Sequence, residues 1–259
     1  MADYGQLELR ILAHMTKCKS MIEAFKLGGD FHSRTALGMY PEIQKAMESR
    51  ECLLEWDYSK GAPPKPLLKD MFANERKKAK IMNFSIAYGK TVHGFMKDWN
   101  CSEEEARNTV SLWYSDRPEV RLWQDKQHEV ARTEYYTRTL LGRERNLTKH
   151  FYSGKSTQKT SPQRQAHALR AAINTPIQGG AADIVMAAMV KIHKDQYLRQ
   201  LGFKLQLQIH DEVILEGPEE NAEDALKRLV QIMEYPLDQP LLVKLEVDAK
   251  IAANWFDAK

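Results

Sequence analysis

The 259-residue sequence has few cysteines and no long apolar run. Its three cysteines, Cys18, Cys52 and Cys101, lie far apart and form no Cys-x-x-Cys pair. A structural zinc site or a disulfide framework is therefore not expected, and a reducing compartment fits. No apolar stretch approaches the length of a membrane span, so we expect no membrane partner. The first residues also lack the pattern of a secretory or transit peptide.

The sequence also has little net charge, because 38 basic residues nearly balance 35 acidic ones and leave a formal charge of +3. The local distribution of charge is more informative. Seven basic residues and one acid, Glu144, lie between Arg143 and Arg170, and residues 76–80 hold four further cations. Basic stripes of this kind can follow a phosphate backbone. Taken alone they are more often solvated helix faces, so nucleic-acid binding stays open at this point.

Helical periodicity dominates the first half of the chain. It is clearest over residues 6–15, 20–47 and 74–88, where apolar side chains recur every three or four positions. The segment 49–69 differs, because it holds one glycine and three prolines. This composition predicts a loop or an insertion.

A further helix is expected after residue 160. Ser161-Pro162 predicts its start, with serine as the cap and proline in the first turn. Pro176 and Gly179-Gly180 are expected to interrupt or kink it, because proline and glycine both disfavour a helix interior.

Strand patterns cluster near the end of the chain. Apolar and polar residues alternate over 203–210 and an apolar triplet follows at 213–215, which predicts a β-hairpin. Residues 243–249 alternate again and predict another strand, and a first strand is expected to end at Asp3. The sequence therefore predicts an α+β fold, with helices over a small antiparallel sheet.

Two acids, Asp211 and Glu212, lie where the expected hairpin turns. Acids at a tight turn usually serve the turn itself. The flanking strands are strongly apolar, however, so these carboxylates would top a well-packed hairpin and could offer oxygens to Mg²⁺. Asp3 alone has the position of a helix cap. Together Asp3 and Asp211 could form a two-metal site, although the sequence alone does not show that they meet.

One face of the helix over 74–88 combines cations with aromatic rings. Arg76, Lys80, Phe84 and Tyr88 recur every four residues and therefore share that face. The cations suit a polyphosphate, and the rings suit stacking against a sugar or base. A salt-bridged surface helix with docked aromatic side chains explains the pattern equally well.

Arg170, Asn174 and Gln178 repeat at the same spacing in the later helix. All three side chains can donate hydrogen bonds. Such a face could contact the minor groove or the sugar edges of a duplex. The alternative is an ordinary exposed helix face.

These segments resemble the motifs of family A DNA polymerases, the bacterial DNA polymerase I type. Residues 3–10, DYGQLELR, resemble motif A; residues 76–89, RKKAKIMNFSIAYG, resemble motif B; and residues 208–212, QIHDE, resemble motif C. Residues 170–183, RAAINTPIQGGAAD, and Asn254-Trp255 also match stretches of the family. The motifs follow the family order, and the resemblance covers essentially the whole chain.

The resemblance implies a helical fingers subdomain joined to a partial palm with a small antiparallel sheet, and no thumb. It divides the chain into a palm start at 1–29, fingers at 30–140 and the rest of the palm at 141–259. Family members carry a thumb and the first palm strands ahead of motif A. We therefore expect a C-terminal segment that ends at its natural terminus, Lys259, and polymerises poorly alone.

The resemblance also implies roles for individual residues in DNA-templated DNA synthesis by two-metal phosphoryl transfer. Asp3 and Asp211 are expected to hold two Mg²⁺ ions, supported by Glu212. Lys80 is expected to protonate the leaving pyrophosphate. Glu8 and Tyr88 are expected to disfavour a 2′-hydroxyl. The expected dNTP-binding residues are His32, Arg76, Lys80, Phe84, Tyr88 and Glu8.

Primer–template DNA is the other implied partner, in replication and repair. The residues expected to position it are Gln6, Arg170, Asn174, Gln178 and His210. Two alternatives remain: a catalytically incompetent DNA-binding fragment, and a segment of a single-subunit RNA polymerase, against which Glu8 and Phe84 together argue. The segment 49–69 is longer than in bacterial relatives and resembles the insertion of plant-type organellar enzymes, which implies a plastid or mitochondrion.

Overall fold

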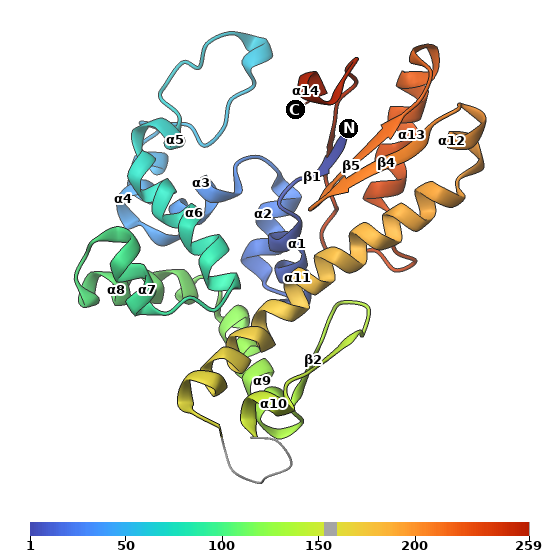
Figure 1. Ribbon diagram of the computed structural model, residues 1–259. Coiled ribbons are helices and arrows are strands. Elements are labelled where there is room, and N and C mark those ends of the chain that lie inside the picture. The colour runs from blue at the N-terminus through green and yellow to red at the C-terminus, as the bar shows by residue number, and fades with distance from the viewer. Residues whose placement is uncertain (153–159, 259) are drawn as a thin grey trace. The chain divides into compact units, whose positions relative to one another are not determined.

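The computed structural model describes residues 1–152 and 160–258 (Figure 1). The chain forms two compact units. The sheet unit comprises Met1–Met15, Tyr136–Asn146 and Thr175–Lys259, and the helical unit comprises Thr16–Tyr135 and Leu147–Asn174. These bounds differ from the division into a palm start at 1–29, fingers at 30–140 and the rest of the palm at 141–259. That division stays a prediction.

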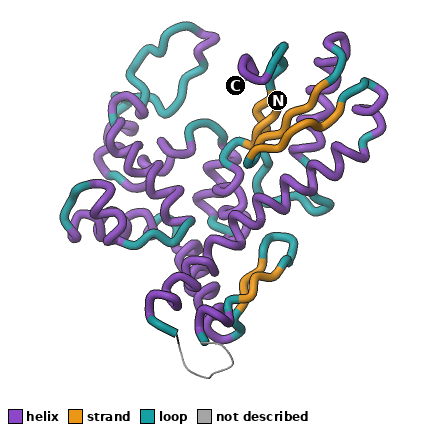
Figure 2. Tube along the Cα trace, in the orientation of Figure 1, coloured by secondary structure: helices purple, strands orange, loops and turns teal. Residues whose placement is uncertain are grey.

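The sheet unit contains a four-stranded antiparallel sheet, drawn as orange strands in Figure 2. Its strand order is β4-β5-β1-β6. The strands are β1 (Ala2–Tyr4), β4 (Lys204–Ile209), β5 (Glu212–Glu216) and β6 (Val247–Ala249). The β4–β5 hairpin confirms the expected turn, and the whole arrangement confirms the α+β fold class.

Helices cover one face of this sheet through a single apolar core. Ala2 and Tyr4 of β1, Val213 of β5 and residues of the covering helices are buried together. Each large apolar side chain buried in this way contributes about 1.5–3 kcal/mol. The Tyr4 hydroxyl also donates to the Met233 carbonyl at 2.8 Å. The helices are α1 (Leu7–Thr16), the later part of α11 (Pro162–Lys194), α12 (Gln196–Gln200) and α13 (Ala222–Glu234).

The last strand is shorter than the alternation over 243–249 predicts, because only Val247–Ala249 pairs with β1. The preceding carbonyl groups have other partners. Arg10 Nη1 donates to the Lys244 carbonyl at 2.6 Å, and the Gly5 amide donates to the Glu246 carbonyl at 2.9 Å. The apolar side chains of this segment are buried without a strand ladder, so the longer strand was a wrong prediction.

The interruption expected at Pro176 and Gly179-Gly180 is also wrong, since α11 runs unbroken from Pro162 to Lys194, whereas the kink stays a prediction. The glycines instead permit a close approach by the hairpin of β2 (Tyr136–Arg138) and β3 (Glu144–Asn146). A Cβ at Gly179 would lie 2.4 Å from Thr139 Cγ2. These glycines are therefore packing residues.

The helical unit confirms the helices expected over 20–47 and 74–88. Ser102 and Glu105 form a capping box at the start of α8. The large side chains Phe31, Phe95 and Trp113 are fully buried or nearly so. The elements are α2 (Lys19–Leu27), α3 (Phe31–Met39), α4 (Pro41–Glu48), η1 (Tyr58–Lys60), α5 (Leu68–Met71), α6 (Ala73–Ala87), α7 (Val92–Trp99), α8 (Glu103–Ser115), α9 (Pro118–Thr133) and α10 (Thr148–Phe151).

The segment 49–69 is a loop, as its composition predicts. It contains the short η1 turn and one parallel bridge between Leu53 and Leu67. Buried Cys52 and Leu67 anchor its two ends.

Two further expectations concern cysteines and membranes. Cys18, Cys52 and Cys101 are free thiols. Within residues 1–152 and 160–258, no helix has both the length and the apolar character needed to cross a membrane. Two cations of the basic stripe, Lys155 and Lys159, lie outside the described residues.

Candidate active site

Acidic side chains gather in the sheet unit around β1. Asp3 lies opposite Glu212 in the β1–β5 register and opposite Asp248 in the β1–β6 register. Directly opposed residues of antiparallel strands share a face of the sheet. Asp211 lies in the β4–β5 turn, where its carbonyl accepts from the Tyr4 amide at 3.4 Å. We call these four residues, Asp3, Asp211, Glu212 and Asp248, the carboxylate edge.

Asp3 lies among like charges at this edge, and a hydrogen bond from the Tyr4 backbone offsets their effect only in part. Burial raises the pKa of Asp3 above its ordinary value, and the negative charges of Asp211 and Glu212 raise it further. Its Oδ1 atom is buried and has no hydrogen-bond partner in the described part of the chain. A buried carboxylate oxygen among like charges is the kind of ligand that a hard divalent cation prefers.

The protein supplies only part of a coordination sphere. Among the described residues no group of three or more His, Cys, Asp or Glu side chains is arranged to hold a metal ion. Mg²⁺ is commonly bound through one or two carboxylates together with substrate phosphate oxygens and water. Asp3 and Asp211 fit that pattern as a pair.

Glu212 and Asp248 have different surroundings from Asp3. The Glu212 side chain is buried and accepts a hydrogen bond from Trp255 Nε1 at 3.3 Å. This indole orients the Glu212 carboxylate. Asp248 is exposed on β6 and belongs to none of the sequence motifs. Its position in the alternating segment 243–249 was the available signal.

The backbone turns sharply at two expected DNA-contact residues. Gln6 precedes α1 and His210 lies in the β4–β5 turn, and both have a φ of 55°. Non-glycine residues seldom adopt this left-handed conformation, and positions that do are often functional. Gln6 Oε1 is also buried without a hydrogen-bond partner in the described residues.

The remaining expected residues of the sheet unit lie on two helices. Glu8 occupies the first turn of α1. Gln178 is exposed on α11. The same helix carries exposed Arg170 and half-buried Asn174 in the helical unit. Tyr88, the C-cap of α6, also belongs to the helical unit. The pairing of Glu8 with Tyr88 therefore stays a prediction.

In the helical unit, Asp30 connects α3 with α6. It is the N-cap of α3 and accepts from the His32 amide at 3.1 Å and from Ser33 Oγ at 2.6 Å. Arg76 Nε of α6 donates to the same carboxylate at 2.5 Å. Burial alone would raise the pKa of Asp30, but the hydrogen bonds from Arg76 and Ser33 outweigh it and lower the pKa to about 2.

His32 lies beside the cation-bearing face of α6. Its ring centroid is 5.6 Å from that of Phe84. Burial lowers the pKa of His32 to about 4; the charge of Asp30 opposes this shift, whereas the cations Arg76 and Lys80 add to it. His32 is therefore neutral near pH 7. The structure thus brings His32, Arg76, Lys80 and Phe84 together, as the motif spacing and the family resemblance imply.

Asn83, which lies outside the four-residue stripe of α6, connects this group to the core. It is completely buried on α6. Its Oδ1 accepts from Trp113 Nε1 at 2.8 Å, while its Nδ2 lies 3.1 Å from His32 Nδ1 and donates to Thr35 Oγ1 at 3.0 Å. The available signal was one polar residue among the buried apolar positions 79, 82 and 86 of α6.

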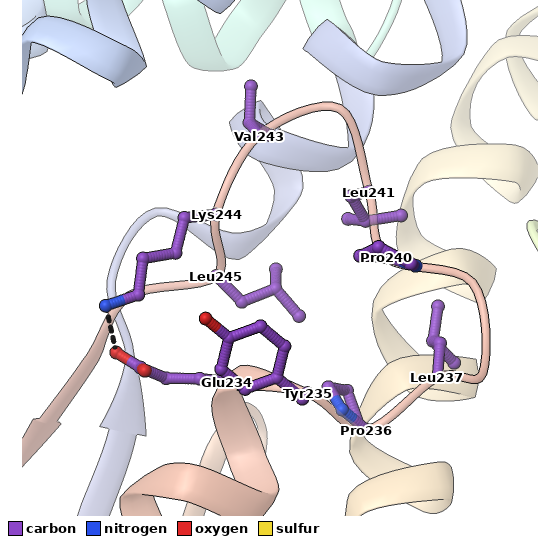
Figure 3. A pocket seen from close by; sticks show the side chains of 9 residues that line it. All are labelled: Glu234, Tyr235, Pro236, Leu237, Pro240, Leu241, Val243, Lys244 and Leu245. Atoms are coloured by element: carbon purple, nitrogen blue, oxygen red, sulfur yellow. Dashed lines mark ion pairs between the residues drawn. The ribbon is translucent and has the colours of Figure 1, made fainter.

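A small pocket in the sheet unit contains none of the expected site residues. It has a volume of about 270 Å³ and is lined by side chains between Glu234 and Leu245 (Figure 3). Most of these side chains are apolar, and Lys244 Nζ pairs with Glu234 Oε1 at 2.6 Å at one end. The candidate site therefore rests on the carboxylate edge and the α3–α6 residues, not on this pocket.

Comparison with known proteins agrees with the motifs. The chain matches the model of DNA polymerase family A over residues 1–52 and 65–257. The unmatched residues 53–64 fall within the loop 49–69.

Individual relatives cover the whole chain. It is 55% identical to the chloroplastic/mitochondrial DNA polymerase I B of Arabidopsis thaliana, over 100% of this chain and 24% of that protein. It is 33% identical to DNA polymerase I of Geobacillus stearothermophilus, over 100% of this chain and 26% of that protein. The chain thus spans about a quarter of the length of these relatives.

A solved structure gives the same result. The POL domain of Pol1 from M. smegmatis, in complex with DNA primer-template and dNTP, matches with a TM-score of 0.75 and 30% sequence identity. The match covers 95% of this chain and 38% of that one. With the family model matched over nearly all of its length, the chain belongs to DNA polymerase family A.

Proposed function

We propose that this chain carries the catalytic segment of a DNA-templated DNA polymerase, which adds dNTPs to a primer 3′-hydroxyl in replication and repair. The observation that carries the proposal is the pairing of Asp3 with the β4–β5 hairpin, which leaves the buried Asp3 Oδ1 without a partner in the described residues. Relatives named DNA polymerase I and a structural neighbour bound to primer-template and dNTP support it.

Asp3 and Asp211 would hold two Mg²⁺ ions. Bound ions supply charge neutralisation at the phosphates and lower the pKa of the primer hydroxyl. Glu212, held by Trp255, would support the ligands or the primer end. Because Asp3 lies among like charges and its Oδ1 has no hydrogen-bond partner in the described residues, its carboxylate is suited to this role.

The triphosphate would bind to His32, Arg76 and Lys80. Arginine has five N–H donors, so the bond from Arg76 Nε to Asp30 is compatible with further bonds from its Nη groups to phosphate oxygens. Lys80 would give a proton to the leaving pyrophosphate. Phe84 would contact the sugar and base, and Glu8 with Tyr88 would disfavour a 2′-hydroxyl.

Primer–template DNA is the other proposed partner. The proposed residues are Gln6, Arg170, Asn174, Gln178 and His210. Affinity for the duplex should fall steeply with salt, because phosphate contacts dominate such binding. We also propose a plastid or mitochondrial location, since several relatives are named as enzymes of these organelles.

The test is extension of a labelled primer by the 259-residue chain and by the natural full-length protein. Template-directed dNTP addition that needs Mg²⁺ and stops with excess EDTA supports the proposal. Equal use of rNTPs would favour the RNA polymerase reading. Duplex binding by the full-length protein without any incorporation would contradict the proposal and favour a catalytically incompetent DNA-binding protein.

A further inference from the structure

We infer that Asn83 is a positioning residue that holds neutral His32 with its proton on Nε2, so that the ring presents a hydrogen-bond donor to a polyphosphate. The inference extends the proposed function, because it takes His32 as a triphosphate ligand. Its geometric basis lies entirely within the helical unit, on α3, α6, α8 and the N-cap of α9.

The orientation of the Asn83 amide follows from Trp113. The indole Nε1–H can only donate a hydrogen bond. It lies 2.8 Å from one end of the amide, which must therefore be the acceptor Oδ1. The other end, Nδ2, then faces His32 Nδ1 at 3.1 Å and Thr35 Oγ1 at 3.0 Å.

The Thr35 hydroxyl agrees with this orientation. It accepts from Arg117 Nη2 at 3.1 Å, and a guanidinium can only donate. It donates its own proton to the Phe31 carbonyl at 3.0 Å. The hydroxyl oxygen can then accept from Asn83 Nδ2 without conflict.

The amide orientation determines the tautomer of His32. An amide NH₂ group only donates, so His32 Nδ1 must offer a lone pair. The proton of the neutral ring then resides on Nε2. An imidazolium would place Nδ1–H against the Asn83 NH₂ group, donor against donor. Burial and the cations Arg76 and Lys80 also lower the pKa of His32, against the opposing charge of Asp30.

A neutral donor has a distinct use beside Arg76 and Lys80. These cations supply the charge that attracts a triphosphate, and a third cation on a buried ring would be repelled by them. A fixed Nε2–H adds a directional hydrogen bond without that repulsion. Asn83 would therefore fix direction rather than contribute charge.

The first experiment measures the two imidazole ¹⁵N shifts of His32 by two-dimensional NMR of the full chain near pH 7. The wild-type ring should have its proton on Nε2. Asn83→Asp keeps the size and the bond from Trp113 but offers an acceptor to Nδ1. In this variant Nδ1 should become protonated and the pKa of His32 should rise. A wild-type ring protonated on Nδ1, or an unchanged ¹⁵N pattern in Asn83→Asp, would overturn the inference.

The second experiment measures the affinity for dATP with Mg²⁺. Asn83→Leu should weaken it by about 3–10-fold, the effect of one misdirected hydrogen bond. Thr35→Val, which keeps the Asn83–His32 contact, is the matched control and should stay within about twofold. Equal losses in both variants would indicate general loosening and overturn the positioning role.

The two experiments separate failure of this inference from failure of the proposed function. If wild type and His32→Ala bind dATP equally, the phosphate role of His32 is wrong, whereas the NMR result still decides the tautomer. If His32→Ala weakens binding and the wild-type proton is on Nδ1, only the inference about Asn83 is wrong.

Discussion

Asp3, in strand β1, and Asp30, the N-cap of α3, are both half-buried aspartates, yet the charges around them are opposite. Asp211, Glu212 and Asp248 surround Asp3 and raise its pKa beyond the effect of burial. Arg76, Ser33 and a backbone amide surround Asp30, and its pKa falls to about 2 despite burial. The surroundings of the carboxylate edge therefore raise the pKa of Asp3, whereas those of the α3–α6 group lower the pKa of Asp30.

This difference indicates that the α3–α6 group stabilises the fold, whereas the carboxylate edge is suited to binding a ligand. A carboxylate with a nearby guanidinium and a capped helix contributes to stability. Carboxylates that oppose one another across strands reduce stability. In the proposed function, a bound cation would offset the like charges at the edge, while the α3–α6 group would hold its donors in place before a nucleotide binds.

The largest expected effect comes from breaking the carboxylate edge with Asp211→Asn. Loss of one metal ligand should reduce primer extension by roughly 10²–10⁴-fold, because several kcal/mol of charge stabilisation are lost in the transition state. DNA affinity should change little. Asp224→Asn, at an exposed residue of α13 paired with Lys227, is the matched control. If Asp211→Asn abolished DNA binding as well, Asp211 would have a structural role.

The second effect tests the neutrality of His32 through acid titration. Its folded pKa of about 4 lies below the ordinary value of 6.5, so the unfolded chain binds more protons between these two values. Stability should therefore fall as the pH drops from about 6.5 to about 4, by about 3 kcal/mol from this group. The free energy of unfolding, measured with urea at several pH values across this range, should depend less steeply on pH in His32→Gln than in the wild type.

His93→Gln, at an exposed residue of α7, is the control for that titration. It should keep the wild-type slope. An unchanged slope in His32→Gln would mean that another group causes the acid sensitivity, and the neutrality assigned to His32 would need revision.

The sequence predicts those parts of both regions that depend on local pattern. The β4–β5 hairpin follows from the alternation of apolar and polar residues, and the α6 stripe follows from a spacing of four. Both are local properties of a strand or a helix. The pairing of Asp30 with Arg76, 46 residues apart, instead depends on how α3 packs against α6.

The errors also have a physical cause. Apolar alternation over 243–249 reports burial, and Val243 and Leu245 are indeed buried, but burial does not require strand pairing. Gly179 and Gly180 suggest a helix break, whereas their small size serves close packing against the β2–β3 hairpin. Asn83 was missed because its partners come from α3 and α8, which no local pattern places beside it.

The third effect separates the cap of Asp30 from its charge. Asp30→Ala removes both and should cost about 1–3 kcal/mol of unfolding free energy. Asp30→Asn keeps a capping oxygen and should cost about half as much. The wild-type contribution should be present above the ordinary pKa and lost as the pH falls from about 4 towards 2, and neither variant should show this loss.

Asp57→Ala is the control for Asp30, since Asp57 is an exposed aspartate that accepts from Ser59 and lies 3.7 Å from exposed Lys60 Nζ. It should change the unfolding free energy much less than Asp30→Ala does. Equal effects at Asp30 and Asp57 would show that the Arg76 contact contributes nothing.

The smallest effect tests whether repulsion between Asp3 and its neighbouring carboxylates destabilises the fold. With EDTA and low salt, Asp3→Asn should raise the unfolding free energy by about 0.2–1 kcal/mol, because it removes a like charge opposite Glu212 and Asp248. Added Mg²⁺ should stabilise the wild type but not the variant, since only the wild type gains a bound ion. Asp224→Asn should respond to Mg²⁺ like the wild type. If Asp3→Asn instead destabilised the protein in EDTA, Asp3 would already be compensated, and the contrast with Asp30 would fail.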